Sequence, residues 1–156
     1  MNKWTRKRKA RGFTLVELLI VIVIIGILAG SMLLVFGSAT DKARASKIVS
    51  NLRSLKAAAL MCYTDYNEWP TTMASLDSYL DRSVPTDSNS GQTYYNIADS
   101  TSTPWWIMAT LQGADNKPGV KDELADMAKE SGLYKDNACS DDYDGSGADV
   151  YVKVAK

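Results

Sequence analysis

The 156-residue chain contains no histidine. This absence excludes histidine-based catalytic triads, H-E-x-x-H zinc sites and histidine general bases. The two cysteines, Cys62 and Cys139, lie too far apart to form a zinc site of ordinary spacing. No glycine-rich phosphate loop follows a strand-like run. The residues therefore carry no pattern typical of an enzyme.

Proline is also scarce, and none occurs before Pro70. The residues from Leu18 to Thr40 are instead free of charge and mostly apolar. A bilayer core is ~30 Å thick, and about 20 helical residues span it. The sequence therefore predicts one membrane-spanning helix near the amino terminus.

The residues before this segment are basic, with no acid among them: Lys3, Arg6, Lys7, Arg8, Lys9 and Arg11. Basic flanks stay in the cytoplasm, which predicts a cytoplasmic amino terminus. A secretory signal has a shorter apolar region and a small-residue cleavage site after it. A plain signal anchor would explain the span and its orientation, but not Gly12, Phe13 or the single acid Glu17.

Residues 12–18 read GFTLVEL and resemble the class III signal of type IV prepilins and type II secretion pseudopilins. The resemblance covers roughly the first third of the chain. It implies cleavage after Gly12 by a membrane prepilin peptidase, N-methylation of Phe13, and an assembly role for Glu17. Removal of residues 1–12 would make a chain of zero formal charge acidic.

A carboxylate inside hydrocarbon is costly and usually has a partner. The amine of Phe13 on a neighbouring subunit is a suitable partner for Glu17, and such a pair would fix the register between subunits. The alternative is that Glu17 simply reaches the lipid headgroups. Further along the same helix, Gly26 and Gly30 have the G-x-x-x-G spacing that lets helix backbones approach closely in lipid.

After Asp41 the pattern becomes amphipathic, with one apolar face. It consists of Ile48, Leu52, Leu55, Ala59, Cys62 and Tyr66. We expect one helix over residues 13–66, of which 13–40 span the membrane. The basic residues between Arg44 and Lys56 form a solvated face or pair with acidic loops of adjacent subunits.

Residues 67–156 are expected to form a single globular domain. Pro70 ends the long helix, and the Trp69-Pro70 pair also resembles the family. Met73, Leu76 and Leu80 predict a short helix, and Val120 to Ala128 predicts another that stops at Gly132. Strand formers occupy 93–97, 105–111 and 150–154, whereas 86–90 and 99–103 read as loops. The predicted fold class is α+β and type IV pilin-like, with a long amino-terminal helix packed on a small antiparallel sheet.

With the cytoplasmic amino terminus predicted above, both cysteines lie outside the cytoplasm, where disulfides persist. A Cys62–Cys139 bond would close a loop of about 76 residues and contribute ~4–5 kcal/mol in chain-entropy models. We expect this disulfide, and two buried thiols are the alternative.

Near the carboxyl end, Asp142, Asp144 and Ser146 have the 1, 3, 5 spacing of a calcium loop, and Asp149 could add an oxygen. Lys153 stands where the closing glutamate would be, and a polar turn explains the composition equally well. The family resemblance favours calcium, because major pseudopilins hold calcium in a carboxyl-terminal loop. No other cofactor is expected.

The sequence thus predicts a structural subunit of a type IV pilus-like filament, or alternatively the major pseudopilin of a type II secretion system. Its expected partners are copies of itself, the prepilin peptidase, an inner-membrane platform and lipid before assembly, but not nucleic acid. We expect a single-pass protein of the cytoplasmic membrane that then enters a cell-surface or periplasmic filament. A monomeric membrane-anchored binding module is the alternative from another class.

Overall fold

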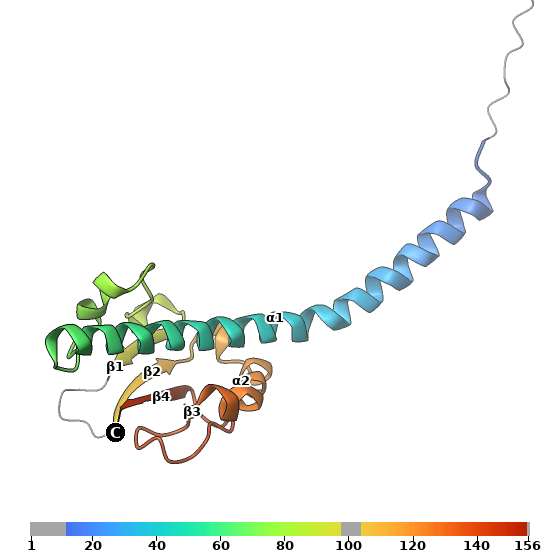
Figure 1. Ribbon diagram of the computed structural model, residues 1–156. Coiled ribbons are helices and arrows are strands. Elements are labelled where there is room, and N and C mark those ends of the chain that lie inside the picture. The colour runs from blue at the N-terminus through green and yellow to red at the C-terminus, as the bar shows by residue number, and fades with distance from the viewer. Residues whose placement is uncertain (1–11, 98–103, 156) are drawn as a thin grey trace, which may run out of the picture. The chain divides into compact units, whose positions relative to one another are not determined.

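The computed structural model describes residues 12–97 and 104–155, without the side chains of residues 33–35 (Figure 1). The basic residues 1–11 and the predicted loop 99–103 lie outside the described residues. Contacts divide the chain into two units, residues 1–37 and residues 38–156. The long helix α1, Leu15–Tyr66, contributes to both units.

In the first unit, α1 consists almost entirely of apolar residues, and its described side chains are largely exposed. Its described large apolar side chains, from Leu15 to Phe36, are 47–85% exposed. Among the described residues, α1 alone is long and apolar enough to cross a membrane by length and composition. A helix that is apolar on all sides needs lipid or other protein around it.

In the second unit, the predicted apolar face of α1 is buried. Ile48, Leu52, Leu55, Ala59 and Cys62 are all at most 4% exposed. Tyr66 was assigned to the same face, and this assignment was wrong: it is 70% exposed. The reason is that the helix ends at Tyr66, where Asn67 turns into the left-handed region with a φ of 54°.

The sheet has four antiparallel strands in the order β1-β2-β4-β3. Three of them match predicted strands: β1 is Tyr94–Ile97, β2 is Trp105–Thr110 and β4 is Asp149–Ala155. The edge strand β3, Leu133–Tyr134, has only two residues, too few for an alternating pattern to indicate it. Along β2 the side chains alternate between buried and half-buried, which is the pattern of a sheet with one face on the core.

Both shorter helical segments form where the sequence predicts them. Helix α2, Pro118–Ser131, has proline in its first turn and ends at Gly132, whose φ is +63°. Its buried face is Val120, Leu124 and Ala128. The segment η1, Met73–Tyr79, is a 3₁₀ helix that buries Leu76. Two further 3₁₀ turns are η2, Ser88–Ser90, and η3, Gly113–Asp115.

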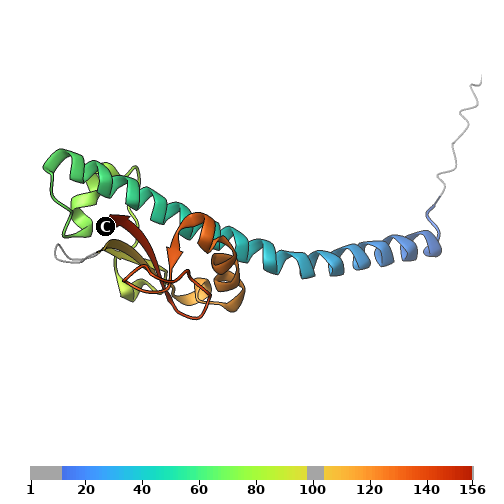
Figure 2. The ribbon, with the colours of Figure 1, turned by 60° about the horizontal axis from the view of Figure 1, so that its bottom comes forward.

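One hydrophobic cluster joins these elements: α1, the sheet, α2 and η1 all contribute buried side chains to it. Within the second unit α1 lies along the sheet, and α2 and η1 lie beside it (Figure 2). Tyr63, Trp69 and Trp105 extend this core as a stack, with ring centroids 4.4 and 5.1 Å apart. The predicted α+β fold, a long helix on a small antiparallel sheet, is confirmed.

Candidate functional site

The beginning of α1 is held by a reciprocal hydrogen-bonded cap. The backbone N–H and the hydroxyl of Thr14 both donate to Oε2 of Glu17, each at 2.8 Å. The backbone N–H of Glu17 donates to Thr14 Oγ1 at 3.2 Å. This is a capping box, and the T-x-x-E spacing that predicts one is visible in the sequence. Thr14 is therefore a site residue that the sequence reading missed.

The two residues at the predicted cleavage point precede the helix. Gly12 and Phe13 lie outside regular structure, and Phe13 is 86% exposed. A side chain built at Gly12 would meet no atom within 4 Å. The peptide bond between them is therefore open to another protein, and the small residue at this position is not required by the fold.

Gly26 and Gly30 are exposed in the same way, because a Cβ at either position would meet nothing within 4 Å. The chain itself therefore gives no steric reason for glycine at these positions. Close packing against a second helix, predicted from their spacing, remains a prediction about assembly.

The structure has Cys62 and Cys139 as free, buried thiols, which is the alternative to the predicted disulfide, and the Cys62–Cys139 bond stays a prediction. Cys62 belongs to the hydrophobic cluster and faces the hollow beside Trp69 and Tyr79. Cys139 lies outside that cluster, in the loop after β3 and near Lys56 and Lys153. Burial raises the pKa of the Cys139 thiol to about 11, so it is a poor nucleophile.

The side chains predicted to bind calcium do not surround one common site. Asp149 Oδ1 accepts a hydrogen bond from Thr110 Oγ1 at 2.7 Å, on the sheet. Asp144 Oδ1 accepts from the backbone N–H of Ser146 at 2.9 Å, so these two residues form a local turn. Asp142 pairs through its backbone with Tyr134.

The ammonium group of Lys135 lies beside the acidic side chains of this loop, where the sequence predicts a calcium ion. Lys135 Nζ lies 3.6 Å from Asp141 Oδ2 and 3.7 Å from Asp144 Oδ2. Throughout residues 12–97 and 104–155, no three His, Cys, Asp or Glu side chains are placed to hold a metal ion. The arrangement of these side chains in the structure does not fit calcium.

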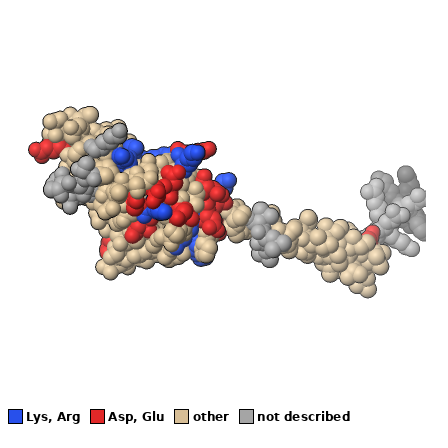
Figure 3. Space-filling view, turned by 90° about the horizontal axis from the view of Figure 1, so that it is seen from below, with Lys and Arg blue, Asp and Glu red and all other residues tan. Residues whose placement is uncertain are grey.

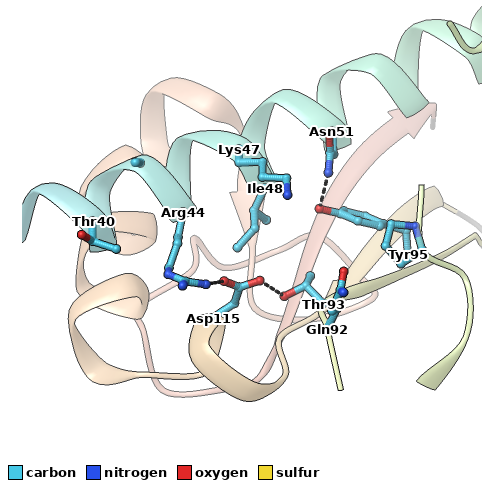
Figure 4. Close-up of a pocket in the computed structure, with 11 residues that line it drawn as sticks. Thr40, Arg44, Lys47, Ile48, Asn51, Gln92, Thr93, Tyr95 and Asp115 are labelled. Carbon is cyan, nitrogen blue, oxygen red and sulfur yellow. Dashed lines mark hydrogen bonds and ion pairs between the residues drawn. The ribbon is translucent and has the colours of Figure 1, made fainter. Parts of the chain in front are cut away.

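The second unit has a groove of about 570 Å³ between α1 and the segments around β1 and η3 (Figure 4). One wall contains an ion pair of 2.9 Å between Arg44 Nη1 and Asp115 Oδ1. The hydroxyl of Thr93 donates to the other oxygen of Asp115 at 2.8 Å. Arg44 is thus paired within its own chain, whereas the sequence left it as a solvated charge or a partner for another subunit.

The other wall of the groove is a buried polar network. Asn51, 5% exposed, donates from Nδ2 to the hydroxyl of Tyr95 at 2.8 Å and accepts from Arg82 Nη2 at 2.8 Å. Burial raises the pKa of Tyr95 to about 12. Lys47, exposed at the rim, makes no ion pair with any residue that the structure describes.

Models of known protein families match residues in both units of the chain. The family model described as "Prokaryotic N-terminal methylation motif" matches residues 7–33, and the one described as "PilW, C-terminal" matches residues 39–106. The type II secretion system core protein G of Klebsiella michiganensis is 31% identical over 76% of this chain and 94% of its own length. A fimbrial protein of Pseudomonas aeruginosa is 30% identical over 78% of this chain and 71% of its own length.

One solved structure shares the fold. It is titled as the structure of the major type IV pilin PilA1 from Clostridium difficile, and it aligns with a TM-score of 0.54. The alignment covers 76% of this chain and 99% of that chain at 18% identity, a level that supports the fold alone.

Proposed function

Because the chain belongs to the family of type IV pilins and type II secretion pseudopilins, it is a filament subunit, and we propose that it forms a pilus-like fibre through α1. The observation that carries this proposal is the exposed apolar half of α1, which begins at the Thr14–Glu17 cap. Lipid covers this surface before assembly, and the helices of other copies cover it afterwards. The related proteins are named for fimbriae and secretion, and the role we propose is structural rather than catalytic.

The precursor is cleaved after Gly12 by a membrane prepilin peptidase, and the new amino terminus at Phe13 is methylated. The match to an amino-terminal methylation motif supports this step. The exposed, irregular backbone at Gly12 and Phe13 also supports it, because a peptidase must bind its substrate in an extended form.

Before cleavage the chain crosses the cytoplasmic membrane once, with residues 1–12 in the cytoplasm. The basic residues before Gly12 support this orientation. An inner-membrane platform then extracts the cleaved chain into the filament. The subunit leaves lipid for a bundle of neighbouring helices, in which Gly26 and Gly30 permit close approach.

Glu17 is proposed to pair with the Phe13 amine of a neighbouring subunit. Among the described residues, Thr14 is the one that donates hydrogen bonds to this carboxylate. Both of those bonds end on Oε2. No described residue donates to Oε1, so Oε1 can accept a bond from a second partner. The same side chain can thus begin its own helix and set the register of the next.

Glu17→Gln and Thr14→Ala separate the capping role of Glu17 from the role of its charge, and Glu17→Ala removes both. Glutamine still accepts the Thr14 bonds as a capping-box residue, but it carries no charge. We expect Glu17→Gln and Glu17→Ala to remain membrane-bound and both to abolish filaments. Thr14→Ala, which removes the two cap bonds of the hydroxyl and keeps the charge, should still assemble.

The assay shears the cell surface, images the released material and determines its amino terminus by mass spectrometry. Wild-type fibres that begin at methylated Phe13 are the expected result. Normal fibres from Glu17→Gln would show that capping, not charge, is what assembly requires. A chain that retains Met1 or Asn2 and forms no fibres would favour the membrane-anchored binding module.

The second candidate is the major pseudopilin of a type II secretion system. It is favoured by the match to core protein G over nearly the whole length of that relative. A methylated chain that stays with the membrane, together with absent surface fibres, would support this candidate over the pilus.

A further inference from the structure

We propose that the exposed acidic row of α2 in one copy docks in the groove beside Lys47 of the next copy. The acidic row is Asp122, Asp126 and Glu130. This inference rests on the proposed function, because it assigns a subunit interface of the filament.

The two surfaces lie on different flanks of α1. The groove is lined on α1 by Arg44, Lys47, Ile48 and Asn51. On the other flank, Arg53 Nη2 donates to Ser131 Oγ at the end of α2, at 3.1 Å. A helical filament needs such an arrangement, because an open polymer grows by a head-to-tail contact between two different surfaces of each subunit.

The acidic row has a regular spacing and is not neutralised within the chain. Asp122, Asp126 and Glu130 follow one another at four-residue steps, so they form a line along α2, and all three are exposed. Lys129 lies beside the line, yet none of the three acids makes an ion pair with a described residue. Seen from below, the globular unit has red acidic side chains gathered near its middle, with blue basic ones among and around them (Figure 3).

The groove offers a carboxylate a positive charge and a hydrogen-bond donor that have no acidic partner among the described residues. Lys47 has no counter-ion among the described residues, and Arg82 binds only the neutral Asn51 there. Tyr95 is 2% exposed, and its hydroxyl accepts from Asn51, but its own hydroxyl hydrogen has no acceptor in the described chain. Figure 4 places this hydroxyl and Lys47 on the same side of the groove.

A second copy is the occupant that these charges select. Lys47 lines the groove without an acidic partner among the described residues, Arg82 binds the groove residue Asn51, and α2 has an excess of acids. Opposite charges across an interface steer association and fix register. Asp126, at the centre of the row, is the carboxylate that we assign to Lys47.

The test is charge reversal in the full-length chain. Lys47→Glu and Asp126→Lys should each reduce the yield of sheared filaments about tenfold, and the double variant should restore it to within about twofold of wild type. The matched controls are Lys42→Glu, exposed on α1 but outside the groove, and Asp77→Lys on η1. Both should assemble normally.

Cross-linking gives a readout that does not depend on fibres. A chain with both Lys47→Cys and Asp126→Cys should form a ladder of multimers on oxidation, in sheared fibres and in membranes, and either single variant should remain monomeric. Dimers from Asp126→Cys alone would reveal an α2–α2 contact and overturn the proposal. Wild-type yield from both single charge reversals would also overturn it. Failure of the wild type to form fibres or to carry methylated Phe13 would instead contradict the proposed function, and the membrane ladder would still decide the interface.

Discussion

The stability of the globular unit should depend on Asn51 in a way that a second substitution reverses. Asn51 is a polar side chain on the buried face of α1, and it joins Arg82 to the hydroxyl of Tyr95. Asn51→Leu would leave that hydroxyl, on a residue only 2% exposed, without its donor. An unsatisfied buried polar group costs about 1–3 kcal/mol, so we expect the free energy of unfolding to fall by that amount.

Tyr95→Phe removes the hydroxyl and leaves Asn51 Nδ2 without a partner in the described chain. Its expected cost is about 1 kcal/mol, the net value of an ordinary hydrogen bond. The double variant Asn51→Leu/Tyr95→Phe replaces both partners by apolar groups, which is often nearly neutral. It should therefore be more stable than Asn51→Leu alone, with a coupling of about 2–4 kcal/mol, the sum of the two single losses.

The assay is chemical denaturation of the full-length chain in detergent, followed by tryptophan fluorescence, because Trp69 and Trp105 stack within the core. Arg53→Ala is the control: Arg53 is exposed and so is its hydrogen bond to Ser131, so water replaces that bond, and the loss should stay below about 1 kcal/mol. Additive effects of Asn51→Leu and Tyr95→Phe would refute the reasoning, because independent sites show no coupling.

Four further outcomes are expected. Leu52→Ala, at a fully buried position, should destabilise the chain by about 2–5 kcal/mol in the same denaturation assay, whereas Leu60→Ala, at 43% exposure, should stay within about 0.5 kcal/mol. Burial raises the pKa of Tyr143 from 10.0 to about 12, so its contribution to stability is complete below pH 10 and lost as pH rises to 12; a melting series should be flatter in that range for Tyr143→Phe. Added calcium, or its removal by chelator, should leave the melting temperature within about 1 °C, because an occupied site would raise it by mass action. Ellman's reagent should find Cys62 and Cys139 unreactive in the native chain and both reactive after unfolding without reductant; no reactive thiol at that stage would restore the disulfide.

The sequence predicted the parts of this fold that have a long regular pattern. The apolar run and the buried stripe of α1 are each repeated over several turns, and the end at Tyr66 follows from the Trp69-Pro70 pair. Helix α2 is bounded by Pro118 and Gly132, residues with strong positional preferences. The edge strand β3 was missed because its two residues form a strand only by pairing with Val152 and Tyr151 of β4.

The candidate sites can likewise be predicted where they consist of consecutive residues, and not where they depend on the tertiary fold. The cleavage motif and the Thr14–Glu17 cap are local, so they can be read from consecutive residues. The groove joins α1 to residues 82, 93–95 and 115, whose proximity depends on the tertiary fold. The structure departs from the calcium and disulfide predictions for this reason: spacing along the chain does not show that Lys135 lies beside the acidic loop, or that Cys139 lies outside the cluster that holds Cys62.

The position of Glu17 gives it control over where α1 resides. The large apolar side chains of α1 before Gly37 are as compatible with lipid as with neighbouring helices, so their burial alone favours neither environment. The choice then depends on packing at small residues such as Gly26 and Gly30 and on polar groups. Glu17 is the only charged residue between Phe13 and Thr40. Among the described residues only Thr14 hydrogen-bonds its carboxylate, whereas in a filament a neighbour's amine could add a charge-assisted bond that lipid tails cannot supply. We therefore propose that this single charge, at the start of an otherwise apolar helix, favours the filament and sets its register.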